Sequence, residues 1–180
     1  MNLERTLALA VEGRLYPSVI LHGGSEAARA EAAIRFVRAL LCERPASERP
    51  CGECRHCRRI ALPESSGDAE TFHPDFFWLT RDLKTSISAE ATKAMLRAAQ
   101  LAPFEARGQA FVIAEAASLS GEASDALLKA IEEPIERAPR NFFLLAPSRL
   151  DLPPTLRSRS LALFLGAPNA VAEERLELAA

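Results

Sequence analysis

Short, mostly apolar runs recur along the chain, and they lack the alternation of apolar and polar residues that marks an exposed strand. The runs lie at residues 17–21, 76–79, 111–114, 142–146 and 161–165. Unbroken apolar runs of this length are typical of strands that are covered on both faces, as in a parallel sheet. The pattern therefore predicts five buried strands.

Between these runs, apolar residues recur at helical spacing. The spacing predicts helices at residues 26–41, 88–101 and 120–133, with a shorter one inside the first 14 residues. Ser88 and Ser120 are suitable N-caps, and Pro134 would end the third helix. Strands that alternate with helices indicate an α/β fold in which helices cover both faces of a parallel five-stranded sheet.

Length and charge restrict what the chain can be. Its 180 residues suffice for one domain and a small appendage. The 22 basic and 24 acidic residues give a net charge of -2, so any nucleic-acid contact must come from a local patch. No apolar run approaches the roughly 20 residues that span a bilayer, and the first residues lack a signal-peptide pattern, so we expect a cytoplasmic protein without membrane contact.

Four cysteines form the clearest chemical motif. Their spacing is C-x8-C-x2-C-x2-C, and in a reducing compartment such spacing favours a metal site over disulfides. We expect a structural Zn²⁺ that stabilises a module of about residues 42–62, which has little apolar core of its own. An iron-sulfur cluster and free thiols are the alternatives. The expected ligands are Cys42, Cys51, Cys54 and Cys57.

Other polar residues near the module have simpler expected roles. His56 adjoins Cys57 and is predicted to be a bystander, and His73 is predicted to form local hydrogen bonds, because four cysteines already complete a tetrahedron. The arginines of the module are predicted to form a solvated face, with nucleic-acid contact as the alternative. They are Arg49, Arg55, Arg58 and Arg59.

The first predicted strand leads through Gly23-Gly24 into a helix, which is the setting of a phosphate-binding loop. A working loop has the pattern G-x-x-x-x-G-K-[ST]. Counted from Gly23, the last three positions hold Ala28, Arg29 and Ala30, so the second glycine, the lysine and the magnesium-binding hydroxyl are all replaced.

The acidic partner of such a loop is also incomplete. The third predicted strand ends in Ala114-Glu115, where an active site would have Asp-Glu, so the carboxylate that supports the magnesium ion is missing. The sequence predicts that this chain neither holds ATP in its own site nor hydrolyses it.

Two further segments carry a family resemblance. The segment EASDALLKAIEEP at residues 122–134 and the segment LRSRS at residues 156–160, together with the cysteine module, resemble bacterial clamp-loader subunits of the replicative DNA polymerase, in the AAA+ class. The resemblance covers about residues 15–165. It implies a three-layer αβα domain like that of the P-loop NTPases, with the zinc module inserted.

Within this gamma, tau and delta-prime family, the altered phosphate loop and His73-Pro74-Asp75 are most similar to the delta-prime branch. The resemblance implies that Arg159 is an arginine finger, donated in trans to the ATP site of a gamma or tau motor subunit. It also implies that delta is a partner, and that the sliding clamp and primed DNA are reached through the assembled complex. A surface arginine that caps carbonyl groups is the alternative for Arg159.

Two other functions remain open on the sequence, a gamma-like or tau-like ATPase and a zinc-containing DNA-binding module. The domain division that we expect is a core at residues 1–165 and, at residues 166–180, the start of a truncated lid or a disordered tail.

Overall fold

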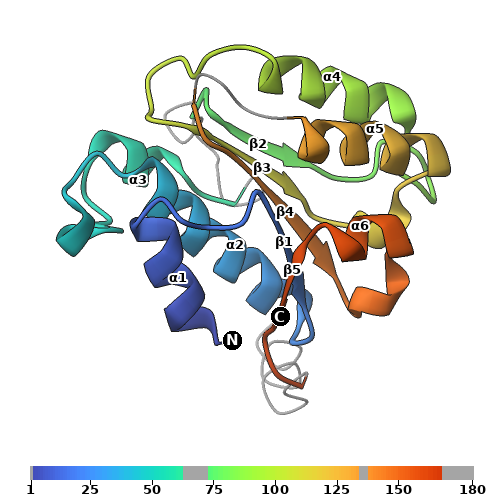
Figure 1. The fold of residues 1–180 in the computed structure, drawn as a ribbon, viewed down its shortest axis with the longest axis horizontal. Coiled ribbons are helices and arrows are strands. Elements are labelled where there is room, and N and C mark those ends of the chain that lie inside the picture. The colour runs from blue at the N-terminus through green and yellow to red at the C-terminus, as the bar shows by residue number, and fades with distance from the viewer. Residues whose placement is uncertain (1, 63–72, 134–137, 168–180) are drawn as a thin grey trace, which may run out of the picture.

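The computed structural model describes residues 2–62, 73–133 and 138–167 (Figure 1). The elements, in chain order, are α1 Leu3–Val11, β1 Ser18–His22, α2 Glu26–Leu41, η1 Ala46–Glu48, α3 Arg55–Arg59, β2 Phe76–Leu79, α4 Ala89–Ala99, β3 Gln109–Ile113, η4 Ala116–Ser118, α5 Gly121–Glu132, β4 Arg140–Ala146, η5 Arg149–Asp151, α6 Pro154–Ser158 and β5 Leu161–Phe164.

The five strands form one parallel sheet in the order β2-β3-β4-β1-β5. This confirms the α/β fold and the five predicted strands. β1, β3 and β4 are buried as predicted, whereas the edge strands β2 and β5 are only partly buried, because each has a neighbouring strand on one side alone. β3 and β4 each begin two residues earlier than predicted, at Gln109 and Arg140. Both residues are polar, but their side chains donate hydrogen bonds to the α4 carbonyl groups of Ala98 and Ala99, at 3.1 and 2.6 Å. Those bonds satisfy Nε2 of Gln109 and Nη1 of Arg140 inside the sheet, whereas Oε1 of Gln109 and Nε of Arg140 have no partner among the described residues.

Helices cover both faces of the sheet, with α1, α2 and α3 on one side and α4, α5 and α6 on the other (Figure 1). Successive residues of a strand point to opposite faces, so Phe143 packs against Phe36 of α2, whereas Phe142 stacks on Phe111 below α4 and α5. Each such fully buried side chain contributes about 1.5–3 kcal/mol.

The helices begin where the sequence predicts. The side chains of Ser25, Ser88 and Ser120 accept hydrogen bonds from the backbone N–H groups of the first turns of α2, α4 and α5. Pro134, which was expected to end α5, lies outside the described residues. Residues 168–180, most of the expected lid or tail, lie outside them as well. The domain boundary at residue 165 stays a prediction.

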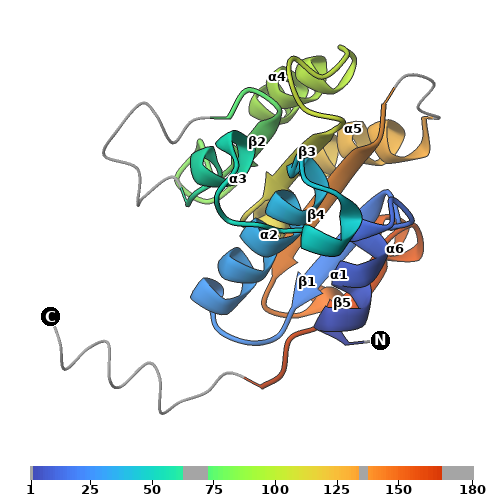
Figure 2. The same cartoon turned by 90° about the vertical axis from the view of Figure 1, so that its left-hand side faces the viewer.

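The sheet has two unlike edges, and the candidate functional residues divide between them. The carboxyl ends of the strands lead into Gly23, Glu115 and Pro147, while Arg159 precedes the amino end of β5. Figure 2 views the face that α1, α2 and α3 cover. In the part of the chain that the structure describes, no helix is both long and apolar enough to cross a bilayer.

Candidate functional site

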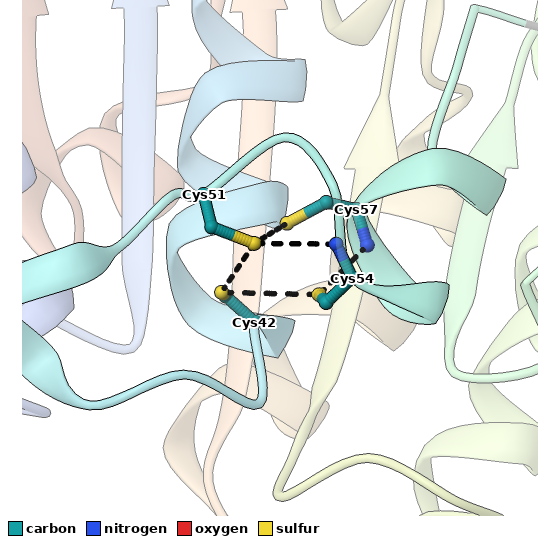
Figure 3. A group of neighbouring side chains, drawn as sticks. All are labelled: Cys42, Cys51, Cys54 and Cys57. Atoms are coloured by element: carbon teal, nitrogen blue, oxygen red, sulfur yellow. Dashed lines mark hydrogen bonds between the residues drawn. The ribbon is translucent and has the colours of Figure 1, made fainter.

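The four cysteine side chains converge between the end of α2 and the start of α3 (Figure 3). Sγ of Cys42 lies 3.7 Å from Sγ of Cys51 and 3.9 Å from Sγ of Cys54. Sγ of Cys51 lies 4.0 Å from Sγ of Cys57. A tetrahedral zinc ion with Zn–S bonds of about 2.3 Å requires S–S separations of about 3.8 Å. The four sulfur atoms therefore fit one tetrahedral metal ion.

Local backbone geometry prepares these thiols to act as ligands. Gly52 has a positive φ of 75°, which makes the tight turn between the second and third cysteines. The N–H of Cys54 donates to Sγ of Cys51 at 3.3 Å, and the N–H of Cys57 donates to Sγ of Cys54 at 3.4 Å. Backbone N–H donors lower the pKa of Cys51 to about 6, whereas burial raises the pKa of Cys42.

His56 was predicted to be a bystander of the cysteine site, and the structure gives it a hydrogen-bonding partner that the sequence did not indicate. Its ring is buried, and Nδ1 lies 2.7 Å from Nε2 of His73. His73 is buried as well, and its Nδ1 accepts a hydrogen bond from the N–H of Asp75 at 3.0 Å. The local hydrogen bonding expected of His73 is therefore present, and it links the cysteine module to the entry of β2.

His56, His73 and Glu105 lie close enough to hold a second metal ion, but their hydrogen bonds favour a different arrangement. Because Nδ1 of His73 accepts the Asp75 N–H, the neutral ring carries its proton on Nε2 and donates it to His56. A metal at that nitrogen would require the ring to lose this proton. The two rings therefore form a histidine pair, which holds the module against the sheet.

Charged groups surround the histidine pair. Arg59 forms an ion pair with Glu105, and Arg55 forms one with Glu43 at 3.3 Å. Burial, with a smaller effect from His56, lowers the pKa of His73 to about 4, so this ring is neutral at pH 7. Glu105 was not recognised from the sequence, because its 46-residue separation from Arg59 leaves no local signal.

The other arginines of the module are only partly available to an outside partner. Nε of Arg49 donates to the Arg44 carbonyl at 2.5 Å, and Nη1 donates to the Val11 carbonyl at 3.4 Å. Arg58 is exposed. Three of the four arginines therefore contact their own chain, and nucleic-acid contact by this face stays a prediction.

At the opposite end of α2, the glycine turn after β1 is closed by its own chain. Nη1 of Arg29 donates to the carbonyl groups of Gly23 and Gly24, at 3.1 and 2.9 Å. Arg29 is buried, with only 9% of its surface exposed. Its guanidinium group therefore lies against the turn instead of reaching outward as the lysine of a phosphate loop would.

The backbone N–H groups of this turn also have partners. Gly23 donates to the carbonyl of Pro147 at 3.0 Å, and Gly24 donates to that of Gly166 at 2.7 Å. A Cβ atom on Gly23 would collide with the ring of Phe164 and the carbonyl of Gly166. The segment after β5 thus lies against the turn and takes up N–H groups that a phosphate would need.

Glu115, at the end of β3, is also engaged. Its carboxylate accepts hydrogen bonds from the backbone N–H of Arg81 at 3.0 Å and from Nη2 of Arg81 at 2.8 Å. Burial raises the pKa of Glu115, but the Arg81 bonds and charge outweigh it and hold this pKa below its ordinary value. Arg81 was not recognised as a site residue from the sequence.

Arg159 lies at the amino edge of the sheet, directly after α6, and is exposed. Its Nε forms an ion pair with Glu132 at the end of α5, and its Nη1 donates to Oγ of Ser158 at 3.1 Å. The next residue anchors this segment, since the Ser160 hydroxyl lies 2.7 Å from the Leu156 carbonyl and 2.8 Å from the Ser18 hydroxyl.

A parallel five-stranded sheet between two helical layers, with a glycine turn after its first strand and an inserted cysteine cluster, has the architecture of the AAA+ and P-loop NTPase class. The sequence model of the family "DNA polymerase III, delta subunit" matches residues 3–168. The chain therefore belongs to this family of DNA polymerase III subunits, and the predicted resemblance to clamp-loader subunits of the delta-prime kind is confirmed.

Individual relatives agree with this assignment. The chain is 32% identical over 164 residues to DNA polymerase III subunit delta' of Yersinia pestis, covering 87% of this chain and 44% of that protein. It is 29% identical over 155 residues to subunit tau of Escherichia coli, covering 86% of this chain and 22% of that protein. The chain thus spans less than half the length of these relatives.

The fold also matches a solved structure. A DNA polymerase III gamma subunit-related protein from Thermotoga maritima superposes with a TM-score of 0.66 and 16% identity, covering 98% of this chain and 50% of that chain. At that identity the match supports the fold.

The low pKa of His73 predicts a pH dependence of stability. An unfolded histidine titrates near pH 6.5, so between pH 6.5 and 4 the unfolded chain binds a proton that folded His73 does not. We expect the free energy of unfolding to fall by up to about 1.4 kcal/mol per pH unit over this interval. His73→Gln should have a shallower slope in urea unfolding at pH 7.5 to 4.5. Titration of the cysteines contributes equally to both proteins and cancels in the comparison. Equal slopes would contradict a lowered pKa of His73.

Proposed function

We propose that this chain is a non-catalytic, delta-prime-like part of the DNA polymerase III clamp loader. It supports ATP-driven loading of the sliding clamp by donating Arg159 to the ATP site of a neighbouring subunit. One observation carries the proposal: the turn that would hold ATP is filled by Arg29 and the segment after β5, while Arg159 is exposed at the opposite edge.

Three features of the carboxyl edge argue against ATP binding by this chain. The Arg29 guanidinium contacts the turn, the N–H groups of Gly23 and Gly24 have backbone partners, and Glu115 is held by Arg81. Phosphoryl transfer depends almost wholly on such positioning groups, so their loss removes both the phosphate cradle and the group that would orient water.

The position of Arg159 favours action on another subunit. β1 has five residues and therefore spans about 16 Å between the edge near Arg159 and the edge that carries Gly23. An extended arginine side chain is far shorter than this. Arg159 cannot reach a nucleotide at its own turn, but it is exposed to a neighbour.

The guanidinium group retains the donors that this chemistry needs. Of its five N–H donors, one on Nε faces Glu132 and one on Nη1 faces Ser158, and the other three have no partner among the described residues. During hydrolysis by the neighbour, water bonds to the γ-phosphorus while the bond to the bridging oxygen breaks, giving ADP and phosphate. Arg159 would stabilise the negative charge on the γ-phosphate oxygens in this step.

The partners implied are the gamma or tau motor subunits and delta, with the sliding clamp and primed DNA reached through the assembled complex, in the cytoplasm. We assign a structural Zn²⁺ to Cys42, Cys51, Cys54 and Cys57, because four thiolates at tetrahedral separations suit zinc and leave no open position for catalysis. When bound, the ion would supply folding free energy to a module with little apolar core.

A gamma-like or tau-like ATPase is the second candidate, and two observations favour it: the fold and the retention of Glu115. A zinc-containing DNA-binding module is weaker, because Arg55 and Arg59 are already paired with carboxylates.

We expect no saturable binding of Mg-ATP to the isolated protein at concentrations up to about 1 mM in titration calorimetry. A motor subunit measured in parallel serves as the positive control. Micromolar affinity that disappears in Arg29→Ala would refute the non-catalytic assignment.

In a clamp loader reconstituted with this subunit, we expect Arg159→Ala to reduce ATP turnover about 1000-fold at the site that it faces. Arg157→Ala is the matched control, since it removes an arginine from the last turn of α6, two residues before Arg159, and should leave turnover unchanged. Steady-state ATPase assays distinguish the two. An unaltered rate with Arg159→Ala excludes the finger role.

Elemental analysis of the purified protein should find one zinc ion per chain. Cys57→Ser should lose the metal and lower the free energy of unfolding by roughly 3 kcal/mol or more, because the module depends on the ion for its fold. A folded, metal-free protein whose melting temperature is insensitive to chelators would contradict this assignment.

A further inference from the structure

Arg159 is not a freely moving surface side chain, because two residues of its own chain hold it. Glu132, at the end of α5, binds Nε, and Ser158 accepts a bond from Nη1. The Ser158 hydroxyl in turn lies 2.9 Å from the carbonyl of Thr155 and donates to it, which directs its lone pairs toward the arginine. The guanidinium is thus oriented from one side.

The side that remains open is the side a phosphate would use. Binding at Nε leaves both Nη2 hydrogens and one Nη1 hydrogen without partners among the residues that the structure describes. These hydrogens form the fork that binds phosphate oxygens.

The position of Glu132 in the helix does not stabilise its negative charge. A carboxylate in the last turn of a helix faces the negative end of the helix dipole, which disfavours it. The ion pair with Arg159 joins α5 to the segment after α6, two elements that also contact each other through the apolar cluster on this face. Its effect is therefore to fix the direction of Arg159 relative to the sheet.

We propose that Glu132 is a positioning residue for Arg159: its carboxylate holds Nε and orders the side chain before the neighbour's triphosphate arrives. This inference rests on the proposed function. An exposed arginine loses rotamer freedom when it is fixed by a ligand, and the ion pair removes part of that cost in advance. The expected effect is modest, because both side chains are close to half exposed, at 46% and 43%.

The test uses the reconstituted clamp loader and five variants. Glu132→Ala should lower kcat for ATP about threefold to fivefold, which is the range expected of an exposed ion pair, and should leave KM unchanged, since the neighbour binds ATP with its own groups. In the Arg159→Ala background, the same substitution should have no further effect. Glu132→Gln keeps an oxygen that can accept from Nε and should restore kcat to within about twofold of the wild type.

Glu133→Ala is the matched control. It removes the same charge from the same helix end, and Glu133 has no ion pair in the described residues, so its kcat should equal that of the wild type. Alanine at either position favours the helix, so misfolding does not explain a loss of activity. Melting curves and gel filtration of the complex check this directly.

Each outcome separates the inference from the function on which it rests. If Arg159→Ala lowers turnover but Glu132→Ala does not, or if Glu132→Ala raises it, the positioning role is refuted and the finger role stands. If Glu132→Ala lowers kcat equally with and without Arg159, its effect is merely structural and the inference fails. If Arg159→Ala has no effect on ATP turnover, the proposed function is refuted, and the positioning role that rests on it is refuted too.

Discussion

The parallel pairing of all five strands is the constraint on which the functional arrangement depends. Because every strand runs the same way, each chain segment that leaves the sheet does so at one edge and returns at the other. The turn at Gly23 and the carboxylate of Glu115 are therefore placed together, while Arg159 is placed at the far edge. One molecule cannot use both sets on the same nucleotide, so this geometry agrees with the proposal that Arg159 acts at a neighbour's site.

The altered phosphate turn is a packed structure with satisfied polar groups. Arg29 satisfies two carbonyl groups of the turn, and the backbone of Pro147 and Gly166 accepts its N–H groups. Buried polar groups without partners are costly, and these bonds avoid that cost without a bound phosphate. Arg29, at the position where a working phosphate loop has a lysine, thus stabilises this turn.

The cysteine module is coupled to the sheet by polar contacts as well as by the chain that enters and leaves it. His56 of the module is hydrogen-bonded to His73, which accepts the backbone N–H of Asp75. The buried Asp75 carboxylate in turn accepts N–H bonds from Phe104, Glu105 and Ala106. Glu105 then pairs with Arg59, which belongs to the module. The cysteine module, the entry of β2 and the loop before β3 therefore form one connected unit.

The sequence by itself determined the features that depend on neighbouring residues. These are the five apolar strands, the serine caps of α4 and α5, the cysteine spacing and the departure from the phosphate-loop pattern, because periodicity, capping and ligand spacing act over a few residues. Only the tertiary structure decided the order of the strands, the partner of His56, the contact of Arg81 with Glu115 and the contact of Arg159 with Glu132. Each of these joins residues that are 17 or more positions apart, and such contacts depend on how the sheet brings distant segments together, which no local pattern encodes.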